Sequence, residues 1–243
     1  MKQKLIQYWK IISSNYIKPK ITQMNINIYK KIIIIIFMSK SNSQLGQDIE
    51  VLKYYNNKKN GYFIEVGASD GIEISNTYLL EKEYDWTGIC IEPIPYKYNL
   101  CLKNRTKSIC CNKALYSKSN EQFIFDISHN DTLFSGISDY IIDRHKNYIN
   151  SNKTQFIVTT ITLTDLLDQH NAPEFIEYLS IDTEGTELEI LKGIDFNKYK
   201  FGLIDIEHNH VEPKRTQMRE LLLSKGYEYI RENQWDDSYR YKK

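Results

Sequence analysis

An acid and two glycines accompany a short apolar run in the sequence YFIEVGASDG, residues 62–71. A glycine lets the backbone turn tightly and lets a ligand approach closely, which is the role we assign to Gly67 and Gly71. Glu65 precedes both glycines, and its carboxylate would repel a pyrophosphate but attract an amine or another cation. The dinucleotide fingerprint G-x-G-x-x-G does not occur here. The pattern therefore predicts a cationic or amine-bearing ligand at the tip of a strand.

Two further polar side chains accompany the next two apolar runs. Glu92 ends the run 86–92, and a carboxylate at this place in an α/β fold can accept hydrogen bonds from both hydroxyls of a ribose. Asn112 lies in the run 108–116, where its amide could meet an adenine edge. Each feature alone is typical of an ordinary turn. An acid for an ammonium, an acid for a ribose and an amide for a purine, at three consecutive strand ends, together describe S-adenosylmethionine.

A second group of polar residues follows two later apolar runs and would serve the reaction itself. Methyl transfer to a hydroxyl is helped by a base close to the acceptor. We assign Asp182 to the cofactor or the acceptor, with Glu184 beside it, and His208 to the base. The alternatives are that Asp182 and Glu184 only favour the start of the next helix, and that His208 and His210 lie in a solvated loop.

No spacing in the sequence demands a metal ion, so no metal ligand is assigned. The alternative is a magnesium-like ion held by oxygen and nitrogen ligands from four residues, namely Asp182, Glu184, Glu207 and His208.

The apolar runs and turn residues also predict the elements that would position these side chains. Alternating strands and helices indicate a mostly parallel sheet covered on both faces. A closing pair of strands, 227–231 and 238–241, would add an antiparallel C-terminal edge. In such sheets ligands bind beyond the carboxyl ends of the strands, where the strand order reverses. The parallel strands are expected at residues 62–68, 86–92, 108–116, 178–182 and 201–207.

Residues 121–163 interrupt this alternation. Strand-like runs at 121–127 and 156–163 flank a polar stretch, with a short helix expected around residues 138–148. A segment this long without clear structure is typical of a lid or a binding loop. Within it, HNDTLFSG at residues 129–136 is the expected contact with the methyl acceptor.

From about residue 43 to residue 209, the chain resembles the FkbM family of S-adenosylmethionine-dependent methyltransferases. The stretch DTEG followed by E-x-x-x-L-K-G is the most specific part of the resemblance. The matching stretches are SQLGQD at 43–48, GYFIEVGASDGIEISNT at 61–77, CIEP at 90–93, NKAL at 112–115, LSIDTEGTELEILKGID at 179–195 and IDIEHN at 204–209.

The resemblance implies a class I methyltransferase fold, which is a Rossmann-like three-layer α/β sandwich, and methylation of an oxygen on a sugar or polyketide hydroxyl. It also implies a role for each matching residue. Glu65, Gly67 and Gly71 would line the methionine end of the cofactor, Glu92 would hold the ribose, and Asn112 would lie near the adenine. Asp182 and Glu184 would face the acceptor and the sulfonium, with Glu207, His208 and Asn209 on the same rim.

Length and composition set the remaining expectations. The 243 residues suffice for one methyltransferase domain, which we place at 41–243 after an N-terminal extension, 1–40, that lacks periodicity and is expected to be disordered. The apolar run 32–38 is far shorter than a membrane span, although a membrane-proximal anchor is the alternative. The four cysteines have no zinc-ligand spacing, so we expect reduced thiols and a cytoplasmic location.

The sequence thus predicts an O-methyltransferase for a carbohydrate-like hydroxyl or a small metabolite. A net charge of +1 gives no basic surface for nucleic acid, and the Asn/Asp-Pro-Pro-Tyr/Phe tetrad of amino-methylating enzymes does not occur. The alternative function is a catalytically inactive protein that uses the same fold to bind a nucleoside or a partner.

Overall fold

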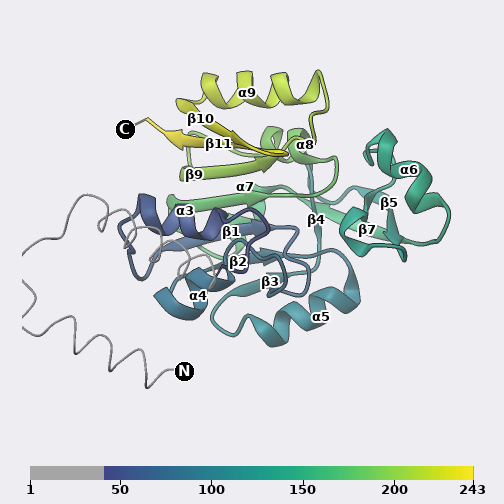
Figure 1. Cartoon of the computed structure of the whole chain (residues 1–243), viewed down its shortest axis with the longest axis horizontal. Helices are drawn as coiled ribbons and strands as arrows, with labels where there is room; N and C mark the ends of the chain where they lie inside the picture. The colour runs from purple at the N-terminus through teal and green to yellow at the C-terminus, as the bar shows by residue number, and fades with distance from the viewer. Residues whose placement is uncertain (1–40, 243) are drawn as a thin grey trace, which may run out of the picture. The chain divides into compact units, whose positions relative to one another are not determined.

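A seven-stranded sheet forms the centre of the chain in the computed structural model, which describes residues 41–242 (Figure 1). The strand order is β10-β11-β9-β8-β1-β2-β3. The strands are β1 (Tyr62–Val66), β2 (Thr87–Ile91), β3 (Ile109–Cys111), β8 (Phe175–Ile181), β9 (Lys200–Glu207), β10 (Tyr227–Asn233) and β11 (Asp236–Tyr241).

All the pairings from β3 to β9 are parallel, and β11 lies antiparallel between β9 and β10. The parallel strands are continuous apolar runs because the sheet is covered on both faces. Ile64, Ile89, Leu179 and Ile204, one from each of four neighbouring strands, are fully buried. The mostly parallel sheet with an antiparallel C-terminal edge is therefore confirmed.

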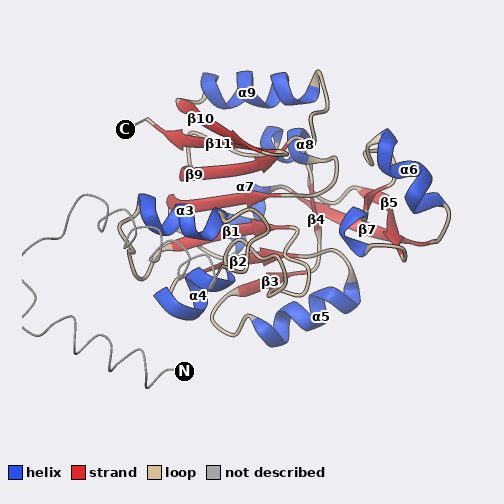
Figure 2. Cartoon of the chain, viewed as in Figure 1, coloured by secondary structure: helices blue, strands red, loops and turns tan. Residues whose placement is uncertain are grey.

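Helices lie on both sides of this sheet (Figure 2). From β1 the chain moves outward through β2 to β3, and it later returns to β8 on the other side of β1 and moves outward to β9. Because parallel crossovers are right-handed, the helices of the two halves cover opposite faces, and the order reverses between β1 and β8. This is the class I methyltransferase sandwich. Its helices are α3 (Gln47–Tyr54), α4 (Tyr78–Tyr84), α5 (Pro95–Asn104), α7 (Leu163–Gln169), α8 (Glu187–Lys192) and α9 (Lys214–Ser224).

The insertion between β3 and α7 forms a second, four-stranded sheet with the order β4-β7-β5-β6. It has a small apolar core that includes Phe125, Ile137 and Val158. In Figure 1 the strands β1 and β9 point toward this insertion. Its elements are β4 (Ala114–Leu115), β5 (Gln122–Ser128), the 3₁₀ helix η1 (Thr132–Phe134), β6 (Gly136–Ile137), α6 (Asp143–Asn150) and β7 (Lys153–Ile161).

One predicted element is wrong. The expected third strand, 108–116, is two strands, since β3 pairs with β2 in the large sheet and β4 pairs with β7 in the small one. Asn112 lies at the break, where its Nδ2 donates to the carbonyl oxygens of Glu92 and Pro93, both at 2.9 Å. These hydrogen bonds hold Asn112 at the end of β2, at the point where the backbone leaves the large sheet for the small one.

The expected extension, 1–40, and its apolar run fall outside the described residues. Between residues 41 and 242, none of the helices combines the length and the apolar composition that a membrane span requires.

Candidate functional site

A cavity of about 380 Å³ lies at the carboxyl ends of β1, β2, β8 and β9. This volume is within the usual range of small-molecule sites. Two acids mark the ends of the cavity, because Glu92 directly follows β2 and Glu207 ends β9. In the strand order β9-β8-β1-β2 these strands are three spacings apart, which is about 14 Å. Residues of the insertion line the cavity as well, among them Phe134 and His145. The cavity is thus elongated across the point where the strand order reverses.

Gly67 makes the turn out of β1 at this point. Its φ is +88°, and a Cβ there would come within 2.0 Å of the carbonyl oxygen of Asp182. The amide of Asp182 in turn donates to the carbonyl oxygen of Val66 at 3.1 Å. Only glycine fits this left-handed, crowded position. Because Gly67 has no side chain, the ends of β1 and β8 can lie close together in the cavity wall.

Glu92 lines the cavity and is 5% exposed. Its two carboxylate oxygens accept one backbone N–H each, from Ser69 and from Ile94, both at 2.8 Å. Burial raises the pKa of this carboxyl to about 7. Since a carboxylate oxygen can accept two hydrogen bonds, each oxygen retains capacity for a ligand hydroxyl.

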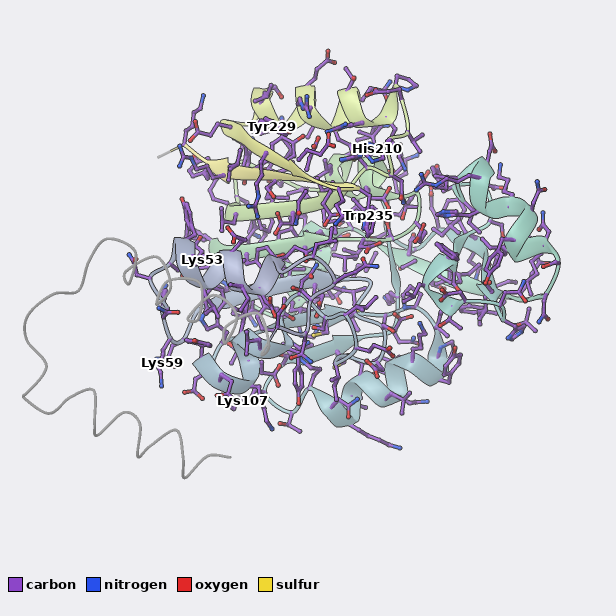
Figure 3. The ribbon with its side chains drawn as sticks, in the orientation of Figure 1. Lys53, Lys59, Lys107, His210, Tyr229 and Trp235 are labelled. Atoms are coloured by element: carbon purple, nitrogen blue, oxygen red, sulfur yellow. The ribbon has the colours of Figure 1, made fainter. Side chains whose placement is uncertain are left out.

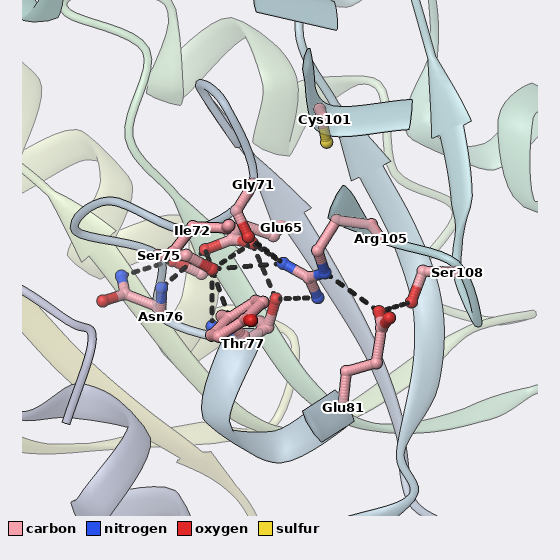
Figure 4. Close-up of polar contacts among 12 residues, drawn as sticks. Glu65, Gly71, Ile72, Ser75, Asn76, Thr77, Glu81, Cys101, Arg105 and Ser108 are labelled. Carbon is pink, nitrogen blue, oxygen red and sulfur yellow. Dashed lines mark hydrogen bonds and ion pairs between the residues drawn. The ribbon is translucent and has the colours of Figure 1, made fainter. Parts of the chain in front are cut away.

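Glu65 and Gly71 do not line the cavity. Glu65 is buried, and its carboxylate accepts hydrogen bonds from Asn76 N at 2.6 Å and Thr77 Oγ1 at 2.6 Å (Figure 4). It also forms a buried ion pair with Arg105, in which Nη1 lies 3.1 Å from Oε2. Gly71 has a φ of +82° and packs on Arg105, whose Cγ would lie 2.7 Å from an added Cβ. The acid before the glycines therefore holds the loop after β1.

Asn112 does not line the cavity either, because both protons of its amide are bonded to the backbone at the end of β2. The polar side chains at the first three strand ends thus divide into two groups. Glu92 and Gly67 face the cavity, whereas Glu65, Gly71 and Asn112 support the loops around it.

Asp182, Glu184 and Glu207 do converge in the cavity. One carboxylate oxygen from each lies within 4.8 Å of the others. Burial and then repulsion by neighbouring acids raise the pKa of Asp182 to about 6 and of Glu184 to about 9, and the same causes raise the pKa of Glu207. Of the four residues that the sequence placed on one rim, these three acids lie together, and His208 does not join them.

The loop after β8 places Glu184. Its backbone is left-handed, with a φ of +58°, and Gly185 follows with a φ of +141° at a position where a Cβ would lie 2.0 Å from the carbonyl oxygen of Tyr140. Glu187 closes the loop by accepting from Gly185 N at 2.8 Å, and it pairs with Lys214 at 2.8 Å. Glu187, and not Asp182 or Glu184, therefore caps the loop at the start of α8.

His208 lies away from this cavity. Its ring is fully buried, Nδ1 accepts from the amide of His210 at 2.9 Å, and Nε2 lies 3.5 Å from Oδ1 of Asp237. Successive residues at the end of a strand point to opposite faces, so when Glu207 faces the cavity the next side chain does not. His208 instead groups with His210 and Glu232, apart from the three acids that it was expected to join.

Several lining residues come from segments without a sequence signal. His145, on α6, has Nδ1 at 3.1 Å from Oε2 of Glu184, and its neighbour Arg144 donates to Oδ1 of Asn209. Trp235 lines the cavity from the turn of the β10–β11 hairpin (Figure 3). The segment 129–136 was expected to contact the methyl acceptor, and five of its positions, from Asp131 to Ser135, line the cavity. His145 belongs to a polar stretch with no periodicity, so nothing in the sequence singled it out.

Similar solved structures include the delta-N METTL16 MTase domain, with 11% identity and a TM-score of 0.43 over 82% of each chain. The precorrin-6y C5,15-methyltransferase from Geobacter metallireducens has 12% identity and a TM-score of 0.41, over 81% of this chain and 87% of that chain. The N-terminal domain of human METTL16 in complex with SAH has 12% identity and a TM-score of 0.42, over 79% of this chain and 68% of that chain. Similarities this distant identify no substrate.

No curated protein sequence matches the chain. The model of the methyltransferase FkbM domain matches residues 65–229, which is well over half of the 243 residues. The matched region includes the turn at Gly67, the acid Glu92, the loop from Asp182 to Gly185 and the end of β9. The chain therefore belongs to the FkbM methyltransferase family.

Proposed function

We propose that this protein is an S-adenosylmethionine-dependent methyltransferase that methylates a hydroxyl oxygen of a sugar, a glycan or another small metabolite. The observation that carries the cofactor assignment is Glu92, a buried carboxylate at the cavity wall with one backbone donor on each oxygen. Such a carboxylate fits the two hydroxyls of a ribose. Gly67, beside it in the wall, lets the remainder of the cofactor lie close to the backbone.

The opposite end of the cavity supports a hydroxyl acceptor. Asp182, Glu184 and Glu207 offer carboxylate oxygens that accept hydrogen bonds from hydroxyl groups. The aromatic faces of Phe134 and Trp235 line the same cavity and provide apolar surface for a ring. Three acids would repel the phosphates of a nucleic acid. A small neutral molecule with several hydroxyls is the acceptor that this end fits best.

Bound S-adenosylmethionine would supply the methyl group as a sulfonium. The chain's own task is to align the acceptor oxygen with that group and to receive the hydroxyl proton. Asp182 is the residue we assign to the proton, because it lines the cavity between the turn at Gly67 and the other two acids. His145, on the insertion, and Asn209, after β9, hold Glu184, with Nδ1 at 3.1 Å and Nδ2 at 3.5 Å from Oε2.

Calorimetric titration with S-adenosylhomocysteine tests the cofactor assignment without an acceptor. We expect one binding site per chain, and a failure to bind would remove the proposed function. Transfer of a labelled methyl group across a panel of glycans and small metabolites then identifies the acceptor. The catalytically inactive alternative would be favoured if the protein binds the cofactor but transfers no methyl group, either to a member of the panel or to a molecule in a whole-cell extract.

A further inference from the structure

Within residues 41–242, no lysine or arginine forms an ion pair with any of the three acids at the ends of β8 and β9, although Arg144 and Lys214 lie close enough to lower the pKa of Glu184. Of the basic side chains near them in residues 41–242, Lys214 is bonded to Glu187 at 2.8 Å and to the carbonyl oxygen of Gly185 at 3.1 Å. Arg144 is bonded to Asn209. Neither cation is paired with Asp182 or Glu207. Buried carboxylates without a counter-charge are costly, so the cluster requires either bound protons or a bound cation.

Glu207 gives the second indication. It is 5% exposed, it lines the cavity, and its Oε2 has no hydrogen-bond partner within the described part of the chain. Buried carboxylate oxygens almost always have a partner, and an orphan next to two other acids points to a ligand that supplies one.

The backbone holds the cluster in a fixed arrangement. Ile181 and Ile206 are in register on neighbouring parallel strands, so Asp182 and Glu207 lie side by side one residue further on. Glu184 is brought back to them by its left-handed backbone, and Glu187 and Lys214 fix that loop. Carboxylates on strand ends and on a braced loop form a preorganised set of ligands.

We propose that Asp182, Glu184 and Glu207 bind one divalent cation of the magnesium or manganese type at the acceptor end of the cavity. Both ions prefer oxygen ligands and retain open positions for water and substrate oxygens when a protein supplies only a few carboxylates.

The cation would also act on the acceptor, and this part of the inference rests on the proposed function. Held by one oxygen of each acid, the cation could bind two neighbouring hydroxyls of a sugar-like acceptor and orient one of them. It would lower the pKa of the bound hydroxyl, as a metal does for bound water. The second oxygen of Asp182 remains free to receive the proton. The acceptor class is thereby narrowed to molecules with adjacent hydroxyls or a similar pair of oxygens.

The ammonium group of the cofactor is the competing occupant of this cluster. The two readings differ in one measurable respect. A cation at the acceptor end is compatible with a cofactor that lies between Glu92 and Asp182, whereas an ammonium on the three acids would exclude the metal.

The proposal is tested by titrating the full chain with Mn²⁺. Binding is measured as the decrease of the free Mn²⁺ signal in electron paramagnetic resonance. We expect one Mn²⁺ per chain, with the affinity unchanged or increased by S-adenosylhomocysteine, and competition by Mg²⁺. Glu207→Gln and Glu184→Gln should each weaken binding at least tenfold. Thermal unfolding in the presence of a chelator shows whether each variant is folded, and either folded variant suffices for the comparison.

Glu232→Gln is the matched control, because it makes the same chemical change in the second group of possible ligands, formed with His208 and His210. It should leave Mn²⁺ binding unchanged. The proposal is overturned by an absence of Mn²⁺ binding at millimolar concentration with and without S-adenosylhomocysteine, by loss of binding in Glu232→Gln alone, or by displacement of Mn²⁺ by S-adenosylhomocysteine. Titration of S-adenosylhomocysteine in the chelator tests the proposed function separately, so the two can fail independently.

Discussion

Nδ1 of His145 lies 3.1 Å from Oε2 of Glu184, which joins helix α6 of the insertion to the loop after β8. Nε of Arg144 donates to Nε2 of the same ring at 3.1 Å. The ring therefore carries its proton on Nδ1 and donates it to Glu184. Burial, and then the charge of Arg144, lower the pKa of His145, so the imidazole is neutral at pH 7. The uncharged ring of His145 thus orients Glu184, although the two residues are 39 positions apart in the sequence.

This contact gives the first prediction. His145→Ala should lower the rate of methyl transfer about tenfold or more, because Glu184 loses the group that orients it, while the affinity for S-adenosylhomocysteine stays within about twofold. The measurements are steady-state transfer with an acceptor from the panel and calorimetric titration.

His208→Ala is the comparison for this prediction, because the ring of His208 is buried away from the cavity. It should leave turnover close to that of the unaltered protein at a temperature where it is folded. If His208→Ala abolishes transfer and His145→Ala does not, the base role that the sequence suggested for His208 is restored.

The second prediction concerns the buried ion pair beneath the turn after β1. Arg105 is 1% exposed, and its guanidinium binds both Glu65 and Glu81. Arg105→Met should lower the free energy of unfolding by about 3–5 kcal/mol, because it leaves two buried acids unpaired. Lys107→Ala breaks an exposed pair with Asp85 on the side of the molecule away from Trp235 in Figure 3, and it should leave the free energy of unfolding nearly unchanged. Denaturant titration of both variants decides this, and equal costs would contradict the structural role of Arg105.

The same network separates two roles for Glu65. If it supports the loop, Glu65→Gln should lower stability and leave the affinity for S-adenosylhomocysteine nearly unchanged well below the melting temperature. A loss of affinity of tenfold or more in a folded Glu65→Gln protein would return this acid to the methionine end of the cofactor, as the family resemblance implies.

The order of strands and helices could be predicted because buried parallel strands are continuous apolar runs that end in turn residues. The same reasoning found the strand ends that meet at the cavity, and with them Gly67, Glu92 and the acids Asp182 and Glu184. These residues could be predicted because their signal is local in the sequence: an apolar run with a glycine or an acid directly after it.

The remaining site depended on contacts that a local pattern does not encode. Glu65 and Glu92 are both acids at strand ends, but Arg105, 40 residues from Glu65, engages the first and leaves the second to the cavity. Glu207 and His208 are adjacent, and a difference of one residue reverses the face to which a side chain points. His145 reaches the acids only because the insertion lies beyond the carboxyl ends of the strands.

The third prediction concerns the N-terminal extension. Within residues 41–242, the residues that line the cavity lie between Gln44 and Trp235, and the same part of the chain supplies the seven strands of the large sheet. A chain that begins at Met38 should therefore have a melting temperature within a few degrees of the full chain and the same affinity for S-adenosylhomocysteine. A fall of many degrees would mean that the apolar run before Met38 packs against the domain.

The fourth prediction concerns the ribose contact. Glu92→Ala should weaken the binding of S-adenosylhomocysteine tenfold or more, because charge-assisted hydrogen bonds of a buried group contribute about 1.5–3 kcal/mol. Asp131→Asn is a suitable control, since Asp131 also lines the cavity but belongs to the insertion, at the start of η1. It should change the affinity by less than threefold. An unchanged dissociation constant in a folded Glu92→Ala protein would remove Glu92 from the cofactor site.

The last prediction is the pH dependence that the buried carboxyl of Glu92 imposes on binding. Its pKa is raised to about 7 in the free protein, because burial penalises the ionised form. Two ribose hydroxyls would donate to the carboxylate and favour that ionised form, so the bound protein must release the proton. The affinity for S-adenosylhomocysteine should therefore rise as the pH increases toward 7 and level off above it. Between pH 5.5 and pH 8 the increase from this group alone is about 30-fold.

Glu92→Gln isolates this effect, because it leaves every other titrating group of the cavity in place and removes only the carboxyl that must ionise. The ratio of the two affinities, measured by calorimetry at half-unit steps of pH, should increase with pH through the same range and then become constant. The acids at the far end of the cavity contribute equally to both curves, so they cancel in the ratio. Parallel pH curves for the two proteins would show that Glu92 does not change its protonation on binding, and the ribose would then have to be held by another group.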